Sequence, residues 1–410
     1  MRHILKASSF GEKRLQALEK IGLFKGDKNS NKSIWIHAVS VGEVNVALKL
    51  IQDLEEILEN PNFILSTTTL TGARKAKENL NKNSIHVYFP FDLKFICKKF
   101  INFHKPSILL LVETEIWPNL INVFNEFKLP VVLVNGRLSK KSLKKYQRLN
   151  FFFKSSFNKI NHAFVQSKND FERFYEAGVK EDAMSVTGSI KFDANSASPK
   201  NFNEHEINYY KEKYVFVCGS THPGEEEILI ESFIDLKKAN KHLVLAPRHP
   251  ERFNEIKELL KEKKLTSIFY TEISSNPNDK SDVTIVDVIG RLLDFYEIAD
   301  YVFIGGTLVD HGGQNFLEPA YFHKPIISGR STYNFEEISQ KLEDLDLLRF
   351  VSNKDEITHA IENMEAISDT LRQEIDIWLD ESRGASKFIS QKICEKFKFC
   401  LLYTSDAADE

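Results

Sequence analysis

Residues 303–319 have the sequence Phe303-Ile304-Gly305-Gly306-Thr307-Leu308-Val309-Asp310-His311-Gly312-Gly313-Gln314-Asn315-Phe316-Leu317-Glu318-Pro319. Residues 301–304 are apolar and partly β-branched, which predicts a short buried strand. Two glycine pairs then indicate a loop, and Asn315 is a good N-cap for a helix with Glu318 in its first turn. Because free backbone N–H groups and the positive end of the helix dipole point the same way, this loop is a candidate anion site. A glycine-rich turn with a helix cap is the alternative, and this stretch alone does not decide between them.

Short apolar strands alternate with longer amphipathic segments along most of the chain. Strands are predicted at residues 33–39, 63–67, 86–89, 108–112, 131–134, 163–165 and 185–187, and again at 214–218, 242–246, 267–270, 283–286, 301–304 and 326–327. Repeated strand–helix units favour parallel, doubly wound sheets, which bind ligands beyond the carboxyl ends of their strands. Residues 195–213 are polar and contain Pro199 with several asparagines, which indicates an interdomain linker.

The order of these segments predicts an α/β protein with two doubly wound, Rossmann-like domains that face each other across a cleft. This is the GT-B architecture of sugar transferases, inferred by analogy of fold. We assign residues 1–195 to an N-terminal domain, 196–213 to the linker and 214–399 to a C-terminal domain whose last helix is predicted at 370–399. Residues 400–410 fit neither domain and resemble translated adapter sequence, so we treat them as a non-native tail.

Length and composition agree with two ordinary globular domains. The chain has 410 residues, 42% of them hydrophobic, and a formal net charge of −3, which gives no overall basic signal for nucleic acid. The four cysteines are far apart with no metal-ligand spacing, which favours a reducing, cytosolic setting. No apolar run has the length of a membrane span, and the N-terminus lacks the apolar core of a signal peptide. We therefore expect a protein that is soluble or lies on a membrane surface.

Three carboxylates follow predicted strands of the first half. Glu43 ends the turn Ser40-Val41-Gly42-Glu43 and begins a helix, where a negative charge commonly does no more than complement the helix dipole. The functional alternative is a general base that takes a proton from a hydroxyl group in the cleft. Glu113 and Glu115 directly follow the strand at 108–112, where packing does not explain two charges.

The second half carries two further features that suit an anion. The turn Gly219-Ser220-Thr221-His222-Pro223-Gly224-Glu225-Glu226 repeats the order of strand, glycine and helix and is a second candidate phosphate turn. Arg248 lies directly beyond the strand at 242–246, where a planar guanidinium suits a phosphate or carboxylate, although a surface ion pair is the commoner role. Asp344 and Asp346 match the loose Asp-x-Asp pattern of metal-dependent transferases, but no strand delivers them to a cleft, and we predict no metal site.

Residues 137–160, the basic segment, carry many basic side chains and no acidic one. The basic residues are Arg137, Lys140, Lys141, Lys144, Lys145, Arg148, Lys154 and Lys159, and apolar residues recur among them at near-helical spacing. One interpretation is a long helix that faces the core and has a solvated basic back. The other is a surface for anionic lipid or for a phosphorylated lipid acceptor.

Several of these stretches, in this order, resemble the 3-deoxy-D-manno-octulosonic acid (Kdo) transferases of lipid A biosynthesis. The resemblance extends from Gly11 to Leu345. Its motifs in the first half are His37-Ala38-Val39-Ser40-Val41-Gly42-Glu43, Glu113-Thr114-Glu115-Ile116-Trp117-Pro118-Asn119-Leu120 and Asn135-Gly136-Arg137-Leu138-Ser139. Those in the second half are Gly188-Ser189-Ile190-Lys191-Phe192-Asp193, Ser220-Thr221-His222, Pro247-Arg248-His249-Pro250-Glu251-Arg252-Phe253 and the stretch 303–319.

The resemblance implies an inverting glycosyltransferase that moves Kdo from CMP-Kdo to a phosphorylated lipid A precursor, lipid IVA, without a metal or other cofactor. It implies that the N-terminal domain binds the acceptor and the C-terminal domain binds the CMP-sugar. By matching positions, Glu43 is the base, and Glu113 and Lys191 stabilise the transition state. The residues implied to hold CMP are Pro247, Arg248, Ile289, Gly290, Arg291, Asn315, Phe316, Leu317 and Glu318. The implied location is the cytoplasmic face of the bacterial inner membrane, peripheral on an anionic surface, with no nucleic acid partner.

The sequence departs from the family's usual pattern at several places. Gln314 stands where a His is usual, Arg291 replaces a Glu, and Arg330 replaces a Pro. Many relatives begin with an apolar membrane anchor that this sequence does not show. We therefore expect either a truncated reading frame or binding to the membrane through the protein surface alone. Two other functions remain open at this point: another enzyme of the same fold that uses a UDP-sugar, either a transferase or an epimerase, and a non-catalytic lipid-binding module that uses only the basic segment.

Overall fold

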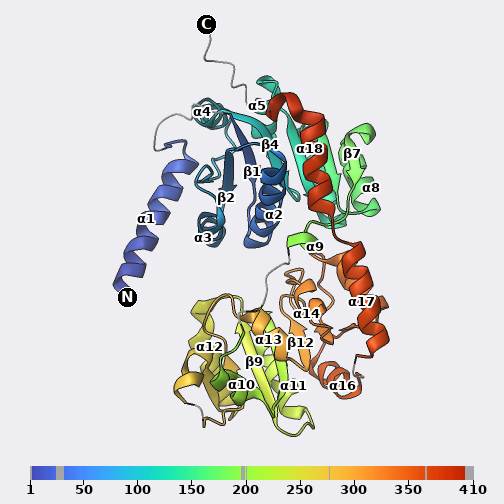
Figure 1. The fold of residues 1–410 in the computed structure, drawn as a ribbon. Helices are drawn as coiled ribbons and strands as arrows, with labels where there is room; N and C mark the ends of the chain where they lie inside the picture. Colours follow the sequence, from blue (N-terminus) through green and yellow to red (C-terminus); the bar gives the residue numbers. More distant parts are fainter. Residues whose placement is uncertain are drawn as a thin grey trace. The chain divides into compact units, whose positions relative to one another are not determined.

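The computed structural model describes residues 2–24, 32–194, 199, 201–276, 278–364 and 367–401. The chain forms two compact units, each built on one parallel sheet (Figure 1). Unit 1 comprises residues 1–194 and 382–410, and unit 2 comprises residues 195–381. Of the predicted tail, residues 402–410 lie outside the described residues, while Cys400 and Leu401 end the last helix.

The sheet of unit 1 has seven parallel strands in the order β3-β2-β1-β4-β5-β6-β7. Every residue of β1, β2, β4, β5 and β6 is buried. A strand that is covered on both faces is apolar along most of its length instead of alternating, which is why these strands were recognisable as short apolar runs. The strands are β1 (Ser33–His37), β2 (Phe63–Thr67), β3 (Ile85–Tyr88), β4 (Pro106–Val112), β5 (Val131–Gly136), β6 (His162–Val165) and β7 (Met184–Val186).

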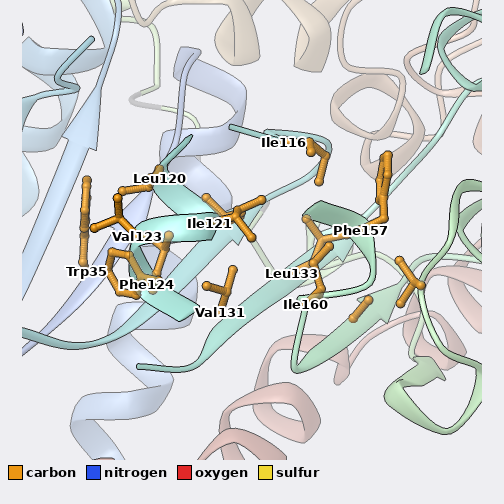
Figure 2. Close-up of a cluster of buried hydrophobic side chains, with 14 of the residues drawn as sticks. Trp35, Ile116, Leu120, Ile121, Val123, Phe124, Val131, Leu133, Phe157 and Ile160 are labelled. Atoms are coloured by element: carbon orange, nitrogen blue, oxygen red, sulfur yellow. The ribbon is translucent and has the colours of Figure 1, made fainter. Parts of the chain in front are cut away.

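Two clusters of buried side chains cover the two faces of this sheet. Because neighbouring residues of a strand point to opposite faces, Trp35 belongs to one cluster and Ile36 to the other. Figure 2 shows part of the first cluster. Within this cluster the Trp35 ring stacks on Phe100, with ring centroids 3.9 Å apart. The helices of unit 1 are α1 (Arg2–Lys20), α2 (Val41–Ile57), α3 (Leu70–Asn79), α4 (Lys94–His104), α5 (Pro118–Glu126), α6 (Lys140–Arg148), α7 (Asn150–Phe157), α8 (Lys168–Ala177), α9 (Lys191–Ala194) and α18 (Ala385–Leu401).

Unit 2 repeats the same plan with a second sheet of seven parallel strands, in the order β10-β11-β9-β8-β12-β13-β14. Its strands are β8 (Tyr214–Thr221), β9 (Lys241–Pro247), β10 (Ser267–Phe269), β11 (Val283–Ile285), β12 (Tyr301–Ile304), β13 (Ile326–Ser328) and β14 (Leu348–Phe350). Its helices are α10 (Glu204–Tyr210), α11 (Glu225–Asp235), α12 (Phe253–Glu262), α13 (Leu292–Ile298), α14 (Leu317–Tyr321), α15 (Glu336–Asp344), α16 (Lys354–Asn363) and α17 (Asp369–Glu381). The predicted α/β class with two doubly wound domains is confirmed.

The C-terminal end of the chain is divided differently from the prediction. Instead of one helix at 370–399, α17 ends at Glu381, and α18 begins at Ala385 after Gly384, whose φ of +99° suits glycine. Helix α18 packs on α2 and belongs to unit 1, because Ile389 and Ile393 complete the buried cluster that covers one face of the first sheet (Figure 1). The boundary of the C-terminal domain at residue 399 is therefore replaced by the division at 381/382.

Two other segments also differ from their predicted form. Residues 196–213 were assigned to a linker, but residues 204–210 form α10, which is fixed by a capping box between Asn203 and Glu206 and buries Tyr209 and Tyr210 in unit 2. The basic segment is two short helices, α6 and α7, that meet at Leu149, and Arg137 lies before both. Apolar spacing located these segments, but it did not show where each helix ends.

Candidate active site

The three residues predicted to act in catalysis all belong to unit 1. Glu43 follows β1 in the first turn of α2, Glu113 directly follows β4, and Lys191 is the first residue of α9. Strands β1 and β4 are neighbours in a parallel sheet, so their carboxyl ends lie at the same edge. The structure thus places both carboxylates where doubly wound folds bind ligands.

Glu43 is held by the turn that starts α2. Its Oε2 accepts a hydrogen bond from the backbone N–H of Val39 at 2.8 Å, and its Oε1 accepts one from the Ser40 hydroxyl at 2.9 Å. Ser40 is the N-cap of α2, and its Oγ accepts in return from the Glu43 N–H at 3.4 Å. Burial, followed by the negative charges of Glu113 and Glu115, raises the pKa of Glu43 to about 8. A carboxylate with such a pKa is a far better proton acceptor than an ordinary glutamate.

Glu113 is held between two cations. Lys191 Nζ lies 2.9 Å from its Oε1, and Arg137 Nη2 lies 3.2 Å from its Oε2. Burial acts to raise the pKa of Glu113, but Lys191 and Arg137 lower it further, to about 2. Its φ of +59° is in the left-handed region, which turns the chain away from β4 at this residue. Glu113 therefore stays ionised under all conditions in which Glu43 titrates.

A buried amide places Lys191 beside Glu113. Asn135, in β5, has its Oδ1 2.9 Å from the Ile190 N–H and 3.4 Å from the Ser189 hydroxyl, so it anchors the turn that leads into α9. Asn135 has a φ of +54°, which asparagine tolerates better than most residues. Asn135 and Arg137 both belong to one of the family motifs, but the sequence pattern predicted no role in the site for either. The only local signal was an Asn-Gly pair at the end of a predicted strand.

Glu115 and His37 lie next to this group. Trp117 donates its Nε1–H to Glu115 Oε2 at 3.0 Å, and His37 Nε2 lies 3.9 Å from the same oxygen. Burial, with a smaller effect from Glu113, raises the pKa of Glu115 to about 7. Burial lowers the pKa of His37 to about 3, so this imidazole, which stacks on Phe89, is neutral. Glu43, Glu113 and Glu115 form what we call the carboxylate cluster.

The three side chains of the carboxylate cluster are chemically alike but differ in pKa. Glu43 and Glu115 have raised pKa values, whereas Glu113 has a lowered one because its charge is paired. Pairs of titratable groups whose environments push their pKa values apart are typical of acid–base sites. This edge of unit 1 can accept a proton at Glu43 and can offer fixed positive charge at Lys191 and Arg137.

In unit 2, the glycine loop, residues 305–313, is not organised as the sequence suggested. Its backbone N–H groups at Gly306, Thr307 and Leu308 donate to the carboxylate of Glu225 at 2.8–3.0 Å. Helix α14 begins only at Leu317, with Phe316 at its N-cap, and the Asn315 side chain accepts from the Leu317 N–H at 3.1 Å. The prediction that free N–H groups of this loop form an anion site is therefore wrong for the start of the loop, because an internal carboxylate occupies them.

Basic and aromatic side chains gather beyond β8 and β9. Arg248 follows the end of β9, is exposed, and its backbone N–H donates to Thr221 O at 3.0 Å. His222 stacks on His311 with ring centroids 4.4 Å apart, and Gln314 Nε2 lies 3.4 Å from His222 Nε2. Burial, followed by the charges of neighbouring histidines and arginines, lowers the pKa of His222 to about 4. Arg248 offers an anionic ligand at this edge an exposed and permanently charged side chain.

The other residues predicted to bind the nucleotide differ in exposure. Ile289 is 85% exposed and Gly290 has a φ of +83°, so this loop presents its backbone to solvent. The Arg291 guanidinium lies 2.8 Å from Asp294 and 3.5 Å from Glu206, which ties α13 to α10. Its side chain thus joins two helices of unit 2, and the contact of Arg291 with a nucleotide stays a prediction.

The residues of the predicted site around α14 are mostly buried. Phe316 and Leu317 are fully buried. The Asn315 side chain donates a hydrogen bond to Glu318 Oε1 at 3.1 Å. Pro247, which was predicted to bind the same ligand, is the last residue of β9. Burial raises the pKa of Glu318 to about 7, while the Asn315 hydrogen bond lowers it. Phe316 and Leu317 have only their backbone to offer a ligand, whereas Glu318 has a polar side chain.

The described parts of the chain contain no group of three or more histidine, cysteine, aspartate or glutamate side chains placed to hold a metal ion. Asp346, from the Asp-x-Asp pattern, forms an ion pair of 2.8 Å with Arg349. No helix in the same residues is both long enough and apolar enough to cross a bilayer.

The chain is similar to known proteins both in sequence and in fold. Residues 13–194 match the family model described as 3-deoxy-D-manno-octulosonic-acid transferase (kdotransferase). A 3-deoxy-D-manno-octulosonic acid transferase of Haemophilus influenzae is 34% identical over 336 residues, which is 81% of this chain and 78% of that protein. One from Rickettsia typhi is 30% identical and covers 89% of this chain and 78% of that protein.

A third relative is longer than this chain. It is a bifunctional glycosyltransferase/methyltransferase of Fusobacterium nucleatum, 37% identical over 366 residues. The match covers 87% of this chain but only 56% of that protein, so the chain spans about half of its length.

Solved structures of low sequence identity show the fold. A UDP-GlcNAc 2-epimerase of Neisseria meningitidis with bound UDP-GlcNAc has a TM-score of 0.59 at 12% identity and covers 90% of this chain and 100% of that one. The UDP-GlcNAc 2-epimerase of Methanocaldococcus jannaschii has a TM-score of 0.56 at 16% identity, with coverage of 85% and 99%. These similarities support the GT-B class and carry no statement about the substrate.

Proposed function

This chain belongs to the 3-deoxy-D-manno-octulosonic acid (Kdo) transferase family, and we propose that it transfers Kdo from CMP-Kdo to a lipid A precursor, lipid IVA, with inversion at the sugar. The observation that carries the proposal is the carboxylate cluster, in which a proton acceptor, Glu43, is separated from an ion-paired carboxylate, Glu113. A transferase that makes a glycosidic bond to a hydroxyl needs such an acceptor, because that hydroxyl loses its proton as the bond forms.

The proposed reaction has one base and one leaving group. Glu43 takes the proton of the acceptor hydroxyl, whose oxygen forms the new bond to the anomeric carbon of Kdo. The bond from that carbon to the phosphate oxygen breaks, and its electron pair leaves with CMP. Lys191 and Arg137 supply positive charge that offsets the negative charge of the departing phosphate and of the Kdo carboxylate. Glu113 holds both cations in place, and its own negative charge stabilises the positive charge that develops on the sugar ring.

We place the donor nucleotide in unit 2. Arg248 is the side chain that we assign to the phosphate, since it is exposed beyond β9 and has permanent charge. The backbone around Ile289 and Gly290, with Asn315 and Glu318, is assigned to the nucleoside by the family resemblance. The reaction as written uses no metal ion and no other cofactor.

We place the acceptor on the side of unit 1. Lipid IVA is phosphorylated and lies in a membrane, and we propose that the enzyme binds peripherally to the anionic cytoplasmic face of the inner membrane. The exposed face of α6 supports this, since it carries Lys140, Lys141, Lys144, Lys145 and Arg148. Leu149 and Phe152, where α6 meets α7, are 53% and 63% exposed and add apolar surface beside the charges.

The decisive experiment is incubation with CMP-Kdo and tetra-acylated lipid A precursor, followed by mass spectrometry of the lipid. Added mass of one or more Kdo units in the native protein, and none in Glu43→Gln, is the expected result. Thermal-shift measurements with CMP-Kdo and with UDP-GlcNAc separate this function from that of a UDP-sugar enzyme. Stabilisation by UDP-GlcNAc alone, with no Kdo on the lipid, would overturn the proposal.

A further inference from the structure

Glu225 is a fully enclosed carboxylate of unit 2 that no step of the proposed reaction uses. The residue is fully buried at the start of α11. Its Oε2 accepts from the N–H groups of His222 at 2.9 Å and Gly306 at 2.8 Å. Its Oε1 accepts from those of Thr307 and Leu308, both at 3.0 Å. Four backbone donors from two loops thus converge on one side chain.

These are the donors that a glycine loop ordinarily offers to a phosphate group. With two N–H groups on each oxygen, the carboxylate leaves the first half of the loop little donor capacity for a second anion. The loop also has no room to move toward β8. A Cβ at Gly305 would lie 2.1 Å from the carbonyl oxygen of Ser220, and Gly306 has a φ of +73°. The backbone is shaped around the internal carboxylate.

The Glu225 carboxylate also fixes the backbone that carries the His222 and His311 side chains. The backbone N–H of His222 donates to Glu225, and the His222 ring stacks on His311 within the glycine loop. Gly306, whose N–H is bound to Glu225, packs against the His222 and His311 side chains, since a Cβ there would be 3.3 Å from each. Gln314 reaches His222 from the end of the loop. The positions of these groups follow from the loop that Glu225 holds.

We propose that Glu225 is a positioning residue of the donor site, whose carboxylate stays in the glycine loop during turnover, so that side chains such as Arg248, and not the N–H groups of residues 306–308, bind the donor phosphate. This inference rests on the proposed function. The competing account is displacement, in which the donor phosphate expels Glu225 and takes over the same four N–H groups. The two accounts predict opposite signs when the carboxylate is removed. A positioning residue helps the ligand to bind, whereas an internal competitor hinders it.

The test compares Glu225→Ala and Glu225→Gln with the native chain. Glu226→Gln is the matched control, because Glu226 is an equally buried neighbour that binds Arg252 and Thr221 and not the loop backbone. Amide hydrogen exchange of residues 306–308 is measured without ligand. We expect these amides to be protected in the native chain and in Glu226→Gln, and to exchange faster in both Glu225 variants. Unchanged protection in the Glu225 variants would overturn the proposal.

Binding of CMP is then measured by calorimetry, with and without added sodium formate. Glu225→Ala should bind CMP about tenfold or more weakly, and formate, which can occupy the vacated donors, should restore part of the affinity. In turnover the KM for CMP-Kdo should rise more than kcat falls, and the KM for the lipid acceptor should not change. Equal or tighter CMP binding by Glu225→Ala would establish displacement and overturn the positioning role. Failure of the native chain to bind CMP would instead contradict the proposed function, and the ligand-free exchange would still decide the role of Glu225 in the loop.

Discussion

Lys191 Nζ lies 2.9 Å from Glu113 Oε1, although the two residues are far apart in the sequence. This contact joins the end of β4 to the start of α9, and Arg137 at the end of β5 binds the other carboxylate oxygen at 3.2 Å. One ionised carboxylate thereby fixes two cations at the ligand-binding edge of the sheet. The proton acceptor, Glu43, is therefore a different group from the two cations that Glu113 holds.

The first prediction concerns Glu43. Glu43→Gln keeps the size of the side chain and removes its ability to accept a proton, so kcat should fall by roughly 10²–10⁴-fold. Affinity for CMP, measured by calorimetry, should remain, since the donor is assigned to unit 2. Glu56→Gln is the control, because Glu56 is exposed near the other end of α2. A near-normal rate in Glu43→Gln would remove Glu43 from the role of base.

The second prediction concerns pH. Burial and the charges of Glu113 and Glu115 raise the pKa of Glu43 to about 8, and a base acts only when it is deprotonated, so kcat/KM should rise with pH up to about pH 8. Glu115→Gln removes one of the negative charges that face Glu43, while Glu113, Lys191, Arg137 and neutral His37 remain. The pKa of Glu43 should then be lower, and the rise in rate should occur at lower pH. An unshifted profile in Glu115→Gln would show that this charge does not act on the base.

The third prediction concerns acid stability. The pKa of Glu113 is lowered to about 2 in the folded protein, so its ion pairs stabilise the fold above the ordinary glutamate pKa and this stabilisation is lost as pH falls toward 2. Glu113→Gln leaves Lys191 and Arg137 without their carboxylate, and it should lower the thermal midpoint at pH 7. Between pH 5 and pH 3 the midpoint of this variant should fall less than that of the native chain. An equal fall in both would contradict the assigned pKa.

The fourth prediction concerns Arg248. Arg248→Ala should weaken CMP binding by about 1.5–3 kcal/mol, the range for a hydrogen bond to a charged group. Arg349→Ala is the control, because Arg349 is an exposed arginine of unit 2 whose ion pair is with Asp346. Calorimetric titration of CMP into the three proteins gives the comparison. If Arg248→Ala binds CMP as well as the control does, the donor phosphate lies elsewhere.

The fifth prediction concerns the exposed face of α6. Reversal of Lys140, Lys141, Lys144 and Lys145 to Glu should abolish sedimentation with anionic liposomes and raise the KM for the lipid acceptor, since each basic residue near such a surface contributes about 1 kcal/mol. High salt should reproduce the loss in the native chain, because it screens these charges. The affinity for CMP should not change.

A second quadruple variant serves as the control for that experiment. Four exposed lysines of unit 2, Lys237, Lys261, Lys264 and Lys280, are reversed in the same way and change the net charge by the same amount. This variant should still sediment with the liposomes. If the α6 variant binds as tightly as the control variant, α6 is an ordinary solvated surface and another part of the chain contacts the membrane.

The sequence was most informative where a structural rule is local. Strand β4 was predicted because its residues are apolar on both faces, and the position of Glu113 followed from its place directly after that strand. The contacts that complete the site are not local. Glu225 meets Gly306 across 81 residues and Asn135 meets Ile190 across 55, and no spacing or periodicity encodes such pairs. The amphipathic pattern of α18 likewise shows that one face is buried but not which sheet buries it.

Helix α18 has a consequence for the order in which the protein can fold as it is made. Translation delivers residues 33–194, with all seven strands of the first sheet, long before it delivers Ile389 and Ile393, which cover part of one face of that sheet. Unit 2 is encoded without interruption between them. A nascent chain therefore carries a first sheet with exposed apolar surface while the second sheet assembles. Domains usually fold in the order of their synthesis, but here unit 1 can complete its core only after unit 2 has been synthesised. The unit that is started first is finished last.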